Sequence, residues 1–398
     1  MPSLKIALVS DWYLPRVGGL ELHMRDLARE LTRRGHEAHV ITATPGPPGQ
    51  DGFPVHRLRV PLLPVLRTIA NRRALDVLEE IVRRERFDLL HCHAGLSPLA
   101  IGGVHVARRL GIPSVVTEHS VLRGQRTLLR LLDSVSGWLG RPDVLSGVSR
   151  YVVQEQRRIY RRDDIVVLPN GIDLDAWRVQ RPPTSELRVT SVMRFTRRKR
   201  PTDFVRAIPE IMRRLPPGIC PRFTLVGDGP ERPRVEREAH RLGVEDLLEL
   251  PGLLSRQEIK HILARSALFV LPTIKEALSI ATLEARCVGL PVVARNHGGV
   301  SDALVHGRHG FLADTWEEFI DYIVRLLCDA ELRHRMAEEA KLDLDRFAWD
   351  EVIWRHERVY QMAQERCARS AGLAPLRRWT GPAVIQLGKP VPRMAAEG

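Results

Sequence analysis

Two glutamates in one short segment are the first residues of this chain that suggest chemistry. Glu276 and Glu284 both lie in the stretch PTIKEALSIATLEARCVGLPVVA, residues 272–294. Glu276 stands among turn-forming residues, whereas Glu284 lies within residues 278–288, whose pattern predicts a helix. An ionised carboxylate only accepts hydrogen bonds, so such a pair suits the hydroxyl groups of a ligand. Two alternatives stay open: a paired-carboxylate hydrolase, or one turn residue and one surface residue without a role.

The backbone between the two glutamates adds a second kind of binding group. Leu278, Ser279 and Ile280 would supply free N–H groups, because the first amides of a helix lack partners within it. A nucleotide sugar has two hydroxyl-rich pieces, a ribose and a hexose, separated by a diphosphate. Two carboxylates with amides between them match that layout, and we therefore expect a nucleotide sugar to bind here.

Two further segments could bind a diphosphate. Arg194 and Lys199 follow an apolar run that predicts a strand, and two cations there could neutralise phosphate charge. The alternative for them is a solvated basic loop. Gly18 and Gly19 lie between the first predicted strand and a helix, where glycines let backbone amides approach an anion closely. The alternative for this pair is a tight turn that binds nothing.

The elements that must position these residues alternate between short apolar runs and amphipathic helical segments. Strands are expected in the first half at residues 5–10, 36–43, 88–93, 113–119, 143–149 and 164–172, and helices at 21–34, 71–86 and, in the second half, 203–214. The pattern breaks at the polar, proline-containing residues 178–188 and then starts again. Such alternation predicts parallel, doubly wound α/β sheets, whose ligands bind beyond the carboxyl ends of the strands.

We therefore expect two Rossmann-like domains, residues 1–182 and 187–347, which face each other across a deep cleft. A helix is expected at residues 348–367, where it would pack back toward the first domain. Residues 372–398 are rich in proline and glycine and predict an irregular tail.

Composition narrows the class of protein and its location. No apolar run reaches the roughly 18 residues that cross a bilayer, and the first residues predict a strand, so we expect a cytoplasmic protein. The five cysteines include no C-x-x-C pair, which argues against a disulfide framework. A net charge of +13 suits a phosphate-rich ligand, an anionic membrane or a nucleic acid. We expect no nucleic-acid partner, because no recognised module for one is present.

Possible metal ligands occur in three places, and none of them predicts a metal site. Residues 91–93 read His-Cys-His, but neighbouring residues of a strand point to opposite faces, and no further ligand cluster follows nearby. Of the two D-x-D pairs, residues 173–175 belong to a loop and residues 343–345 are expected in a helix. We expect no metal and no cofactor, since a nucleotide sugar would be a co-substrate.

The glutamate segment also resembles a known signature. Family 4 of the retaining glycosyltransferases has two glutamates separated by seven residues, as this chain does. Other segments of this chain also resemble family segments and occur in the family's order: GGLELHMRDLARELTRRGHEAHVIT, PSVVTEHS, GVSRYVVQE, VVLPNGIDLDAW, VMRFTRRKRP, LVGDGPER and GGVSDALVHGRHGFL. The resemblance covers roughly residues 4–362. Within the family, the chain looks especially like the catalytic subunits that add N-acetylglucosamine to phosphatidylinositol.

The resemblance implies the GT-B fold, with an acceptor-binding first domain and a nucleotide-sugar-binding second domain. It implies that Glu284 binds the ribose hydroxyls and Glu276 those of the transferred sugar. Arg194 and Lys199 would neutralise the diphosphate as it leaves, and His119 would contact the donor sugar beside the anomeric carbon. The diglycine would place amides near the same diphosphate.

The resemblance also implies a reaction. A hexosyl or N-acetylhexosaminyl unit would pass, with retention of configuration, from a nucleotide-diphosphate sugar to a hydroxyl acceptor, either lipid-linked or a polysaccharide or natural-product precursor. UDP-N-acetylglucosamine is the expected donor, ahead of UDP-glucose and a GDP-sugar. A nucleotide-sugar 2-epimerase, a phosphorylase and a non-catalytic sugar-nucleotide-binding protein are the alternatives. In place of the family's frequent Phe-Gly, this chain has Leu278-Ser279, which bears on donor choice.

Two segments of the first domain mix leucine with arginine. Residues 57–73 and 121–141 could lie on an anionic membrane surface, or could be packed helices with a solvated arginine face. We expect peripheral contact with the inner face of a membrane, as for a lipid-linked acceptor.

Overall fold

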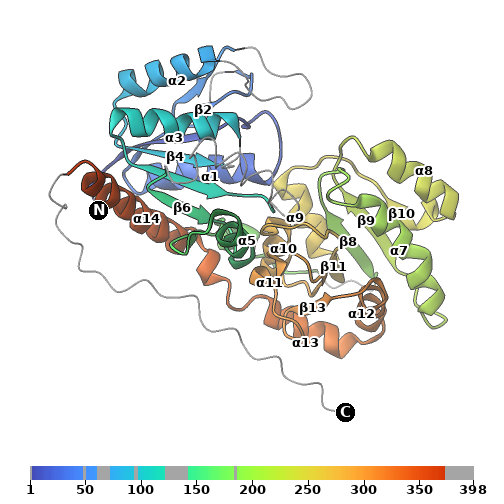
Figure 1. Ribbon diagram of the computed structural model, residues 1–398. Helices are drawn as coiled ribbons and strands as arrows, with labels where there is room; N and C mark the ends of the chain where they lie inside the picture. The colour runs from blue at the N-terminus through green and yellow to red at the C-terminus, as the bar shows by residue number, and fades with distance from the viewer. Residues whose placement is uncertain are drawn as a thin grey trace.

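The structure is a computed structural model that describes residues 2–47, 51–60, 72–93, 97–121, 142–182 and 186–372. It confirms the predicted fold class, because the chain forms two separate parallel sheets, each accompanied by helices (Figure 1). The two leucine- and arginine-containing segments proposed for membrane contact lie largely outside the described residues.

The first sheet has seven strands in the order β3-β2-β1-β4-β5-β6-β7, all parallel where they pair. The strands are β1 (Lys5–Ser10), β2 (Glu37–Thr42), β3 (Val55–Arg57), β4 (Leu89–His93), β5 (Ser114–Glu118), β6 (Val144–Gly147) and β7 (Val166–Val167). The strand predicted at 164–172 is wrong in length, because only two of its residues pair in the sheet. Its end pairs elsewhere, where Ile172 bridges Ala348.

The helices of this half are α1 (Gly19–Arg33), α2 (Arg72–Glu85), α3 (Pro98–Leu110), α5 (Arg150–Tyr160) and α6 (Leu174–Trp177). The start predicted for α1, residue 21, is two residues late. Gly18 caps the helix in an extended conformation and Gly19 is its first residue. The diglycine is therefore part of the helix end and not a turn before it.

The second sheet has six parallel strands in the order β10-β9-β8-β11-β12-β13. They are β8 (Arg188–Val192), β9 (Arg222–Val226), β10 (Leu248–Glu249), β11 (Leu268–Leu271), β12 (Val292–Arg295) and β13 (Gly310–Ala313). Its helices are α7 (Pro201–Arg214), α8 (Arg232–Leu242), α9 (Arg256–Ala264), α10 (Ile280–Cys287), α11 (Val300–Ala303), α12 (Trp316–Cys328) and α13 (Ala330–Ala340), with short 3-10 turns η2 (Glu245–Leu247) and η3 (Asp345–Phe347). The helix predicted over residues 343–345 is wrong, because Asp343 adopts a left-handed conformation and a 3-10 turn follows.

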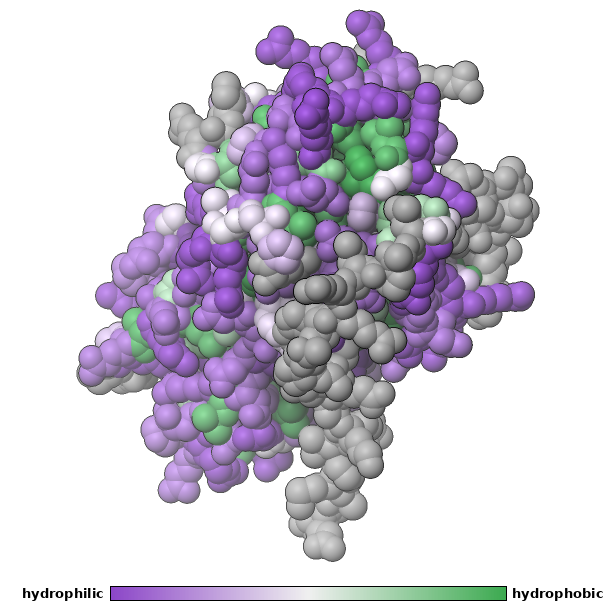
Figure 2. Space-filling view, turned by 90° about the vertical axis from the view of Figure 1, so that its left-hand side faces the viewer, coloured by the Kyte–Doolittle hydropathy of each residue, from purple (hydrophilic) through white to green (hydrophobic). Residues whose placement is uncertain are grey.

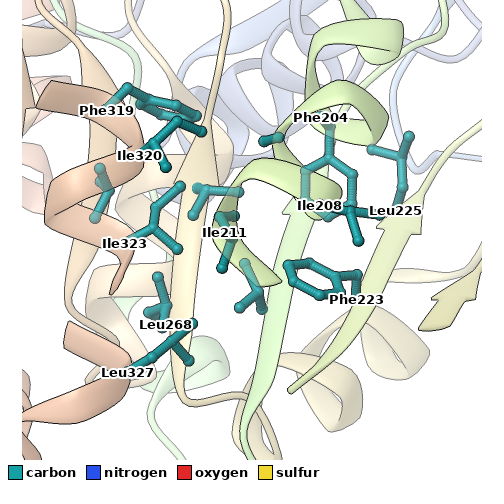
Figure 3. Close-up of a cluster of buried hydrophobic side chains, with 14 of the residues drawn as sticks. Phe204, Ile208, Ile211, Phe223, Leu225, Leu268, Phe319, Ile320, Ile323 and Leu327 are labelled. Carbon is teal, nitrogen blue, oxygen red and sulfur yellow. The ribbon is translucent and has the colours of Figure 1, made fainter. Parts of the chain in front are cut away.

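The core of the second domain fixes two helices against the sheet (Figure 3). Phe204 of α7 meets Phe223 of β9 edge to face, with ring centroids 6.3 Å apart. Phe319 and Ile323 lie one turn apart on the buried face of α12, and all four side chains are at most 2% exposed. Burying such side chains contributes about 1.5–3 kcal/mol each. The cluster therefore holds α7 in a fixed orientation, and with it the loop before α7 that contains Arg194 and Lys199.

The chain then returns to the first domain. Helix α14 (Trp349–Ser370) lies along the first domain in Figure 1 and packs against α1, β5 and β6. Val352, Ile353 and Tyr360 are fully buried in the same apolar cluster as the β1 side chains. The polypeptide therefore crosses between the domains twice, between β7 and β8 and again between α13 and α14.

Candidate active site

The segment that carries Glu276 is fixed by two glycines. Glu276 forms a parallel bridge with Gly298, and the Gly299 amide donates to the Glu276 carbonyl at 2.7 Å. A Cβ atom on Gly298 would lie 2.1 Å from that carbonyl oxygen, and one on Gly299 would lie 1.8 Å from the Ala277 oxygen. No other residue type fits at either position, so the diglycine after β12 sets where the Glu276 side chain points.

Glu276 and Lys199 meet directly. Lys199 stands in the loop between β8 and α7, and its Nζ atom lies 2.5 Å from Glu276 Oε2. The side chain of Glu276 is 8% exposed and that of Lys199 is 22% exposed, so water screens the pair only in part. The Thr273 hydroxyl donates to the Lys199 carbonyl at 3.2 Å, which ties the two loops together. Two residues proposed for adjacent ligand groups are thus brought into contact at the carboxyl end of the second sheet.

The helix that follows starts at Ile280, two residues later than predicted. Ser279 is its N-cap, and the Ser279 hydroxyl accepts a hydrogen bond from the Thr282 amide at 3.2 Å. The Leu278 side chain is 5% exposed and packs into an apolar cluster of the second domain. The Leu-Ser pair therefore stabilises the helix start with its side chains, and leaves its backbone amides as the groups that could meet a ligand.

The N-terminus of α1 faces the N-terminus of α10. A Cβ atom on Gly19 would lie 3.8 Å from the Ile280 side chain, so the two helix ends approach across the domains. A Cβ atom on Gly18 would meet the Glu21 carboxylate at 2.5 Å. Helix N-termini carry partial positive charge, and two of them facing each other make this part of the cleft favourable for an anion.

Arg194 lies near the same place. It is exposed, at the end of β8, and its charge helps to lower the pKa of Glu21 on the opposite domain. Burial outweighs that effect and raises the Glu21 pKa, although Arg16 also pairs with Glu21 at 3.0 Å. Arg194 therefore faces the α1 end of the first domain, as a diphosphate-binding cation would require.

Glu284 occupies a separate position on α10. It is half-buried, and burial raises its pKa to about 7, against the opposing effect of Arg256. The charge of Asp26 raises it further. Arg256 of α9 also pairs with Asp26 of α1 at 2.5 Å, so Glu284 lies beside an ion pair that joins the two domains. This ion pair was not predicted from the sequence.

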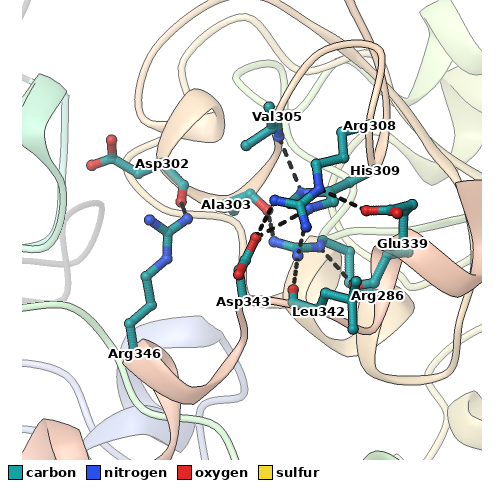
Figure 4. Close-up of polar contacts among 11 residues, drawn as sticks. Arg286, Asp302, Ala303, Val305, Arg308, His309, Glu339, Leu342, Asp343 and Arg346 are labelled. Atoms are coloured by element: carbon teal, nitrogen blue, oxygen red, sulfur yellow. Dashed lines mark hydrogen bonds and ion pairs between the residues drawn. The ribbon is translucent and has the colours of Figure 1, made fainter. Parts of the chain in front are cut away.

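A buried arginine of α10 binds carbonyl groups of neighbouring segments (Figure 4). Arg286 is fully buried, and its guanidinium donates to the carbonyls of Ala340 at 3.0 Å, Leu342 at 2.6 Å and Ala303. Burial lowers its pKa to about 10, so it stays charged at neutral pH. Because Arg286 ties α10 to α11 and α13, it fixes the position of the helix that carries Glu284.

His119 follows β5 at the carboxyl end of the first sheet. Its Nε2 atom lies 2.9 Å from Nδ1 of His93, the last residue of β4. Burial lowers the pKa of His119 to about 3, so its ring is neutral near pH 7. His23 of α1 lies 5.5 Å from His119 between ring centroids and stacks at 5.6 Å on Trp349 of α14. The described contacts include none between His119 and the Lys199–Glu276 pair.

Several polar groups at the carboxyl edge of the first sheet are buried without a hydrogen-bond partner among the described residues. They are Trp12 Nε1, His23 Nδ1, His93 Nε2, Glu118 Oε2 and Asn170 Oδ1. Four of these residues end or follow strands of the first sheet, and His23 lies on α1, which follows β1. They therefore lie toward the carboxyl edge of that sheet. Unpaired buried polar atoms cost free energy and are rare, so these atoms are candidates for pairing with a polar ligand.

The two domains also touch through an ion pair between Arg150 and Asp302. Arg150, at the start of α5, donates from its backbone amide and its Nε atom to Asp302 at 2.5 and 2.6 Å. Ser149 is so close that a Cβ atom on Gly299 would meet its hydroxyl at 2.4 Å. The diglycine that fixes Glu276 is thus also where the first domain contacts the second.

Sequence reasoning missed the residues that only the folded chain brings together. His23, Asp26 and Arg256 were not singled out, and His93 was considered only as a metal ligand. The sequence signal for the Glu276 support was the diglycine in GGVSDAL. Among the described residues, no helix combines the length and apolar character needed to cross a bilayer.

Two protein-family models match adjoining parts of this chain. Residues 17–176 match the model "Glycosyltransferase Family 4", and residues 175–343 match "Glycosyl transferases group 1". A phosphatidylinositol N-acetylglucosaminyltransferase subunit from Arabidopsis thaliana is 26% identical over 95% of this chain and 86% of its own length. The N-acetyl-alpha-D-glucosaminyl L-malate synthase of Bacillus anthracis is 27% identical over 87% of this chain and 94% of its own.

The fold has close counterparts among solved structures. HepE of Anabaena, solved in complex with UDP-glucose, superposes with a TM-score of 0.74 at 20% identity, and the match covers 89% of this chain and 99% of that one. The two family models together extend over both domains and every proposed site residue. The chain therefore belongs to the family 4 glycosyltransferases, enzymes with two Rossmann-like domains in the GT-B arrangement.

Proposed function

We propose that this enzyme transfers an N-acetylglucosaminyl unit from UDP-N-acetylglucosamine to a hydroxyl acceptor, with retention of configuration at the anomeric carbon. The observation that carries the proposal is the Lys199–Glu276 ion pair at 2.5 Å, which lies beside the start of α10. In this pair, a cation suited to a diphosphate lies next to a carboxylate suited to sugar hydroxyls.

The donor would replace the contacts that these groups make to each other. Lys199 would turn from Glu276 to the diphosphate, and Glu276 would then accept hydrogen bonds from hydroxyls of the transferred sugar. Arg194, the Gly18–Gly19 amides and the first amides of α10 would complete the diphosphate site. Glu284, eight positions along the same segment, would accept from the ribose hydroxyls.

The proposed transfer step is the one that the family resemblance implies. The bond between the anomeric carbon and the diphosphate oxygen breaks, and the acceptor oxygen forms the new bond on the same face of the sugar. The acceptor proton passes to the oxygen of the leaving diphosphate. Fixed cations and amides stabilise the charge that develops there, which is the largest effect available to a closed polar cleft. The step assigns no role to a metal ion, and neutral His119 contacts the sugar beside the reacting carbon.

The choice of donor rests on relatives. The names of the Arabidopsis and Bacillus proteins above both refer to an N-acetylglucosaminyl group, whereas HepE was solved with UDP-glucose. The Leu278 side chain is buried in the apolar core, so it would not contact the sugar itself, whereas the backbone of this segment and Glu276 could. UDP-glucose is therefore the matched comparison.

The acceptor would bind in the first domain, at the unpaired polar groups of its sheet's carboxyl edge. These groups are uncharged or carry one buried carboxylate, Glu118, whose pKa burial raises to about 7. Such groups suit a polyhydroxyl compound. We propose that its carrier is a lipid on an anionic membrane, supported by the net charge of +13. The face seen in Figure 2 is mainly hydrophilic, with apolar side chains gathered only in small patches.

A thermal-shift panel tests the donor first. UDP-N-acetylglucosamine at 100 times its Kd would stabilise the fold by about 2.7 kcal/mol through mass action, and GDP-sugars would have little effect. Radiolabelled donor, supplied with anionic liposomes that contain phosphatidylinositol, would then give a labelled lipid. Label that stays in the donor with every acceptor, while UDP-N-acetylglucosamine binds, would contradict the transfer proposal.

Two alternatives make different products from the same donor. A 2-epimerase would release free N-acetylmannosamine without an acceptor, and a non-catalytic binding protein would consume no donor at all. Loss of turnover in Glu276→Gln with the fold retained would exclude the binding protein. Liposome flotation tests the membrane separately, because binding to neither neutral nor anionic vesicles would refute the lipid-surface proposal.

A further inference from the structure

A second cluster of possible ligands lies at the opposite edge of the first sheet. His39 of β2, His56 of β3 and Glu85 at the end of α2 each offer one ligand atom, and these atoms all lie within 4.8 Å of one another. His39 Nδ1 and His56 Nε2 are 2.9 Å apart. Because β2 and β3 pair with Ile41 opposite His56, both histidines point to the same face of the sheet. Helix α2 covers that face and brings Glu85 to it.

The proton positions of this cluster can be deduced. His39 Nε2 lies 3.0 Å from Glu37 Oε1, and a carboxylate only accepts, so Nε2 carries the His39 proton. Nδ1 of His39 therefore presents its lone pair to His56. Metal-binding histidines typically donate their second ring nitrogen to a carboxylate in this way. Phe87 meets the His39 ring edge to face at 5.2 Å and holds its orientation.

An ion bound here would replace contacts that the cluster now makes within the protein. His56 Nε2 donates to the His39 Nδ1 lone pair at 2.9 Å, so an ion between the two rings would require the other His56 tautomer, with its proton on Nδ1. Lys5 pairs with Glu37 at 2.8 Å and so helps to hold the carboxylate that accepts from His39. Glu85 is engaged by Lys5 at 3.3 Å and by exposed Arg84 at 3.2 Å, contacts that an ion would have to displace in part.

We propose that His39, His56 and Glu85 form a binding site for a divalent transition-metal ion, with Zn²⁺ as the preferred ion. Two imidazoles, one carboxylate and a water would complete a four-coordinate site. The two ring nitrogens would separate slightly from 2.9 Å, since each bond to zinc is about 2.0–2.1 Å. His56 and Glu85 are partly exposed, which gives the ion a route from solvent.

The role of this ion would be structural. β3 is the edge strand and has only three residues, so a bond from His56 to the ion would fasten it to β2 and α2. The site lies toward the amino ends of the strands, whereas the transfer site lies at their carboxyl ends. The proposal is therefore independent of the transfer mechanism and does not depend on the donor.

Metal analysis of the whole, tag-free chain tests it. After chelator treatment and dialysis, titration with ZnCl₂ should show one ion per chain and raise the melting temperature. Co²⁺ should give visible absorption typical of a four-coordinate site. His56→Gln and Glu85→Gln should each weaken binding at least about tenfold, in line with losses seen for altered metal sites.

His240→Gln is the matched control, since His240 pairs with Glu245 at 3.0 Å on the surface and has no third ligand among the described residues. It should bind zinc like the parent chain. Absence of stoichiometric binding would overturn the proposal, as would zinc binding that both His56→Gln and Glu85→Gln leave unchanged.

Discussion

Replacing Lys199 by methionine separates its part in catalysis from its part in folding. In the free enzyme Lys199 pairs with Glu276 at 2.5 Å, and the carboxylate is the more buried of the two, at 8% exposed. Methionine has similar length and no charge. The substitution therefore removes the cation proposed for the leaving diphosphate and leaves Glu276 without its partner.

The two losses have different sizes. Removing one group that stabilises developing charge in the transition state typically lowers kcat about 10²–10³-fold, or about 3–4 kcal/mol. Leaving Glu276 unpaired should lower the free energy of unfolding by about 1–2 kcal/mol, less than for a fully buried pair because Lys199 is 22% exposed. The catalytic loss should thus exceed the loss of stability.

UDP release and urea denaturation measure the two effects, and the double variant K199M/E276Q tests their cause. Neutral glutamine needs no cation, so the double variant should regain most of the lost stability while turnover stays low. The reasoning is refuted if K199M retains near-normal kcat, or if E276Q restores no stability in the K199M background.

Three other predictions concern the same cleft. Glu284 must be ionised to accept hydrogen bonds from both ribose hydroxyls. Because its pKa is about 7, the affinity for UDP-N-acetylglucosamine should rise about tenfold from pH 6 to pH 8. Titration calorimetry measures that affinity, and an affinity that does not change with pH in the parent chain would count against the prediction. Gly299→Ala should lower both turnover and the free energy of unfolding, the latter by about 1–3 kcal/mol, because the new carbon meets a carbonyl oxygen at 1.8 Å. Gly307→Ala, whose carbon meets nothing within 4 Å but whose φ of +78° is strained for alanine, should lose about 1–2 kcal/mol of stability and retain full activity. His93→Phe should lower kcat about tenfold with little change in donor KM, because His119 loses the bond that orients it, whereas equal kcat in the phenylalanine and parent enzymes would show that the bond has no such role.

Much of the fold was predictable because its signals are local. Apolar runs that alternate with amphipathic segments specify parallel sheets whatever the distant contacts, and the break at 178–188 falls between the last strand of the first sheet and β8. Helix starts were less accurate, since Gly18 and Ser279 act as N-caps and each predicted start differed by two residues. Strand β7 was overestimated because Ile172 pairs with a segment far along the chain.

The candidate site also has residues that the sequence indicates and residues that only the folded chain brings together. Lys199 and Glu276 were singled out from residue type and position, and the structure brings them into contact. The ion pair of Asp26 with Arg256 joins residues from separate domains, and no pattern in the sequence pairs them. His23 likewise acquires its partner Trp349 only when α14 returns to the first domain.

A structure of the enzyme with UDP-N-acetylglucosamine tests the central claim most directly. The account predicts that Lys199 leaves Glu276 for the diphosphate, that Glu276 accepts hydrogen bonds from the sugar, and that Glu284 accepts them from the ribose. A donor bound away from the start of α10, with Lys199 still paired to Glu276, would contradict it.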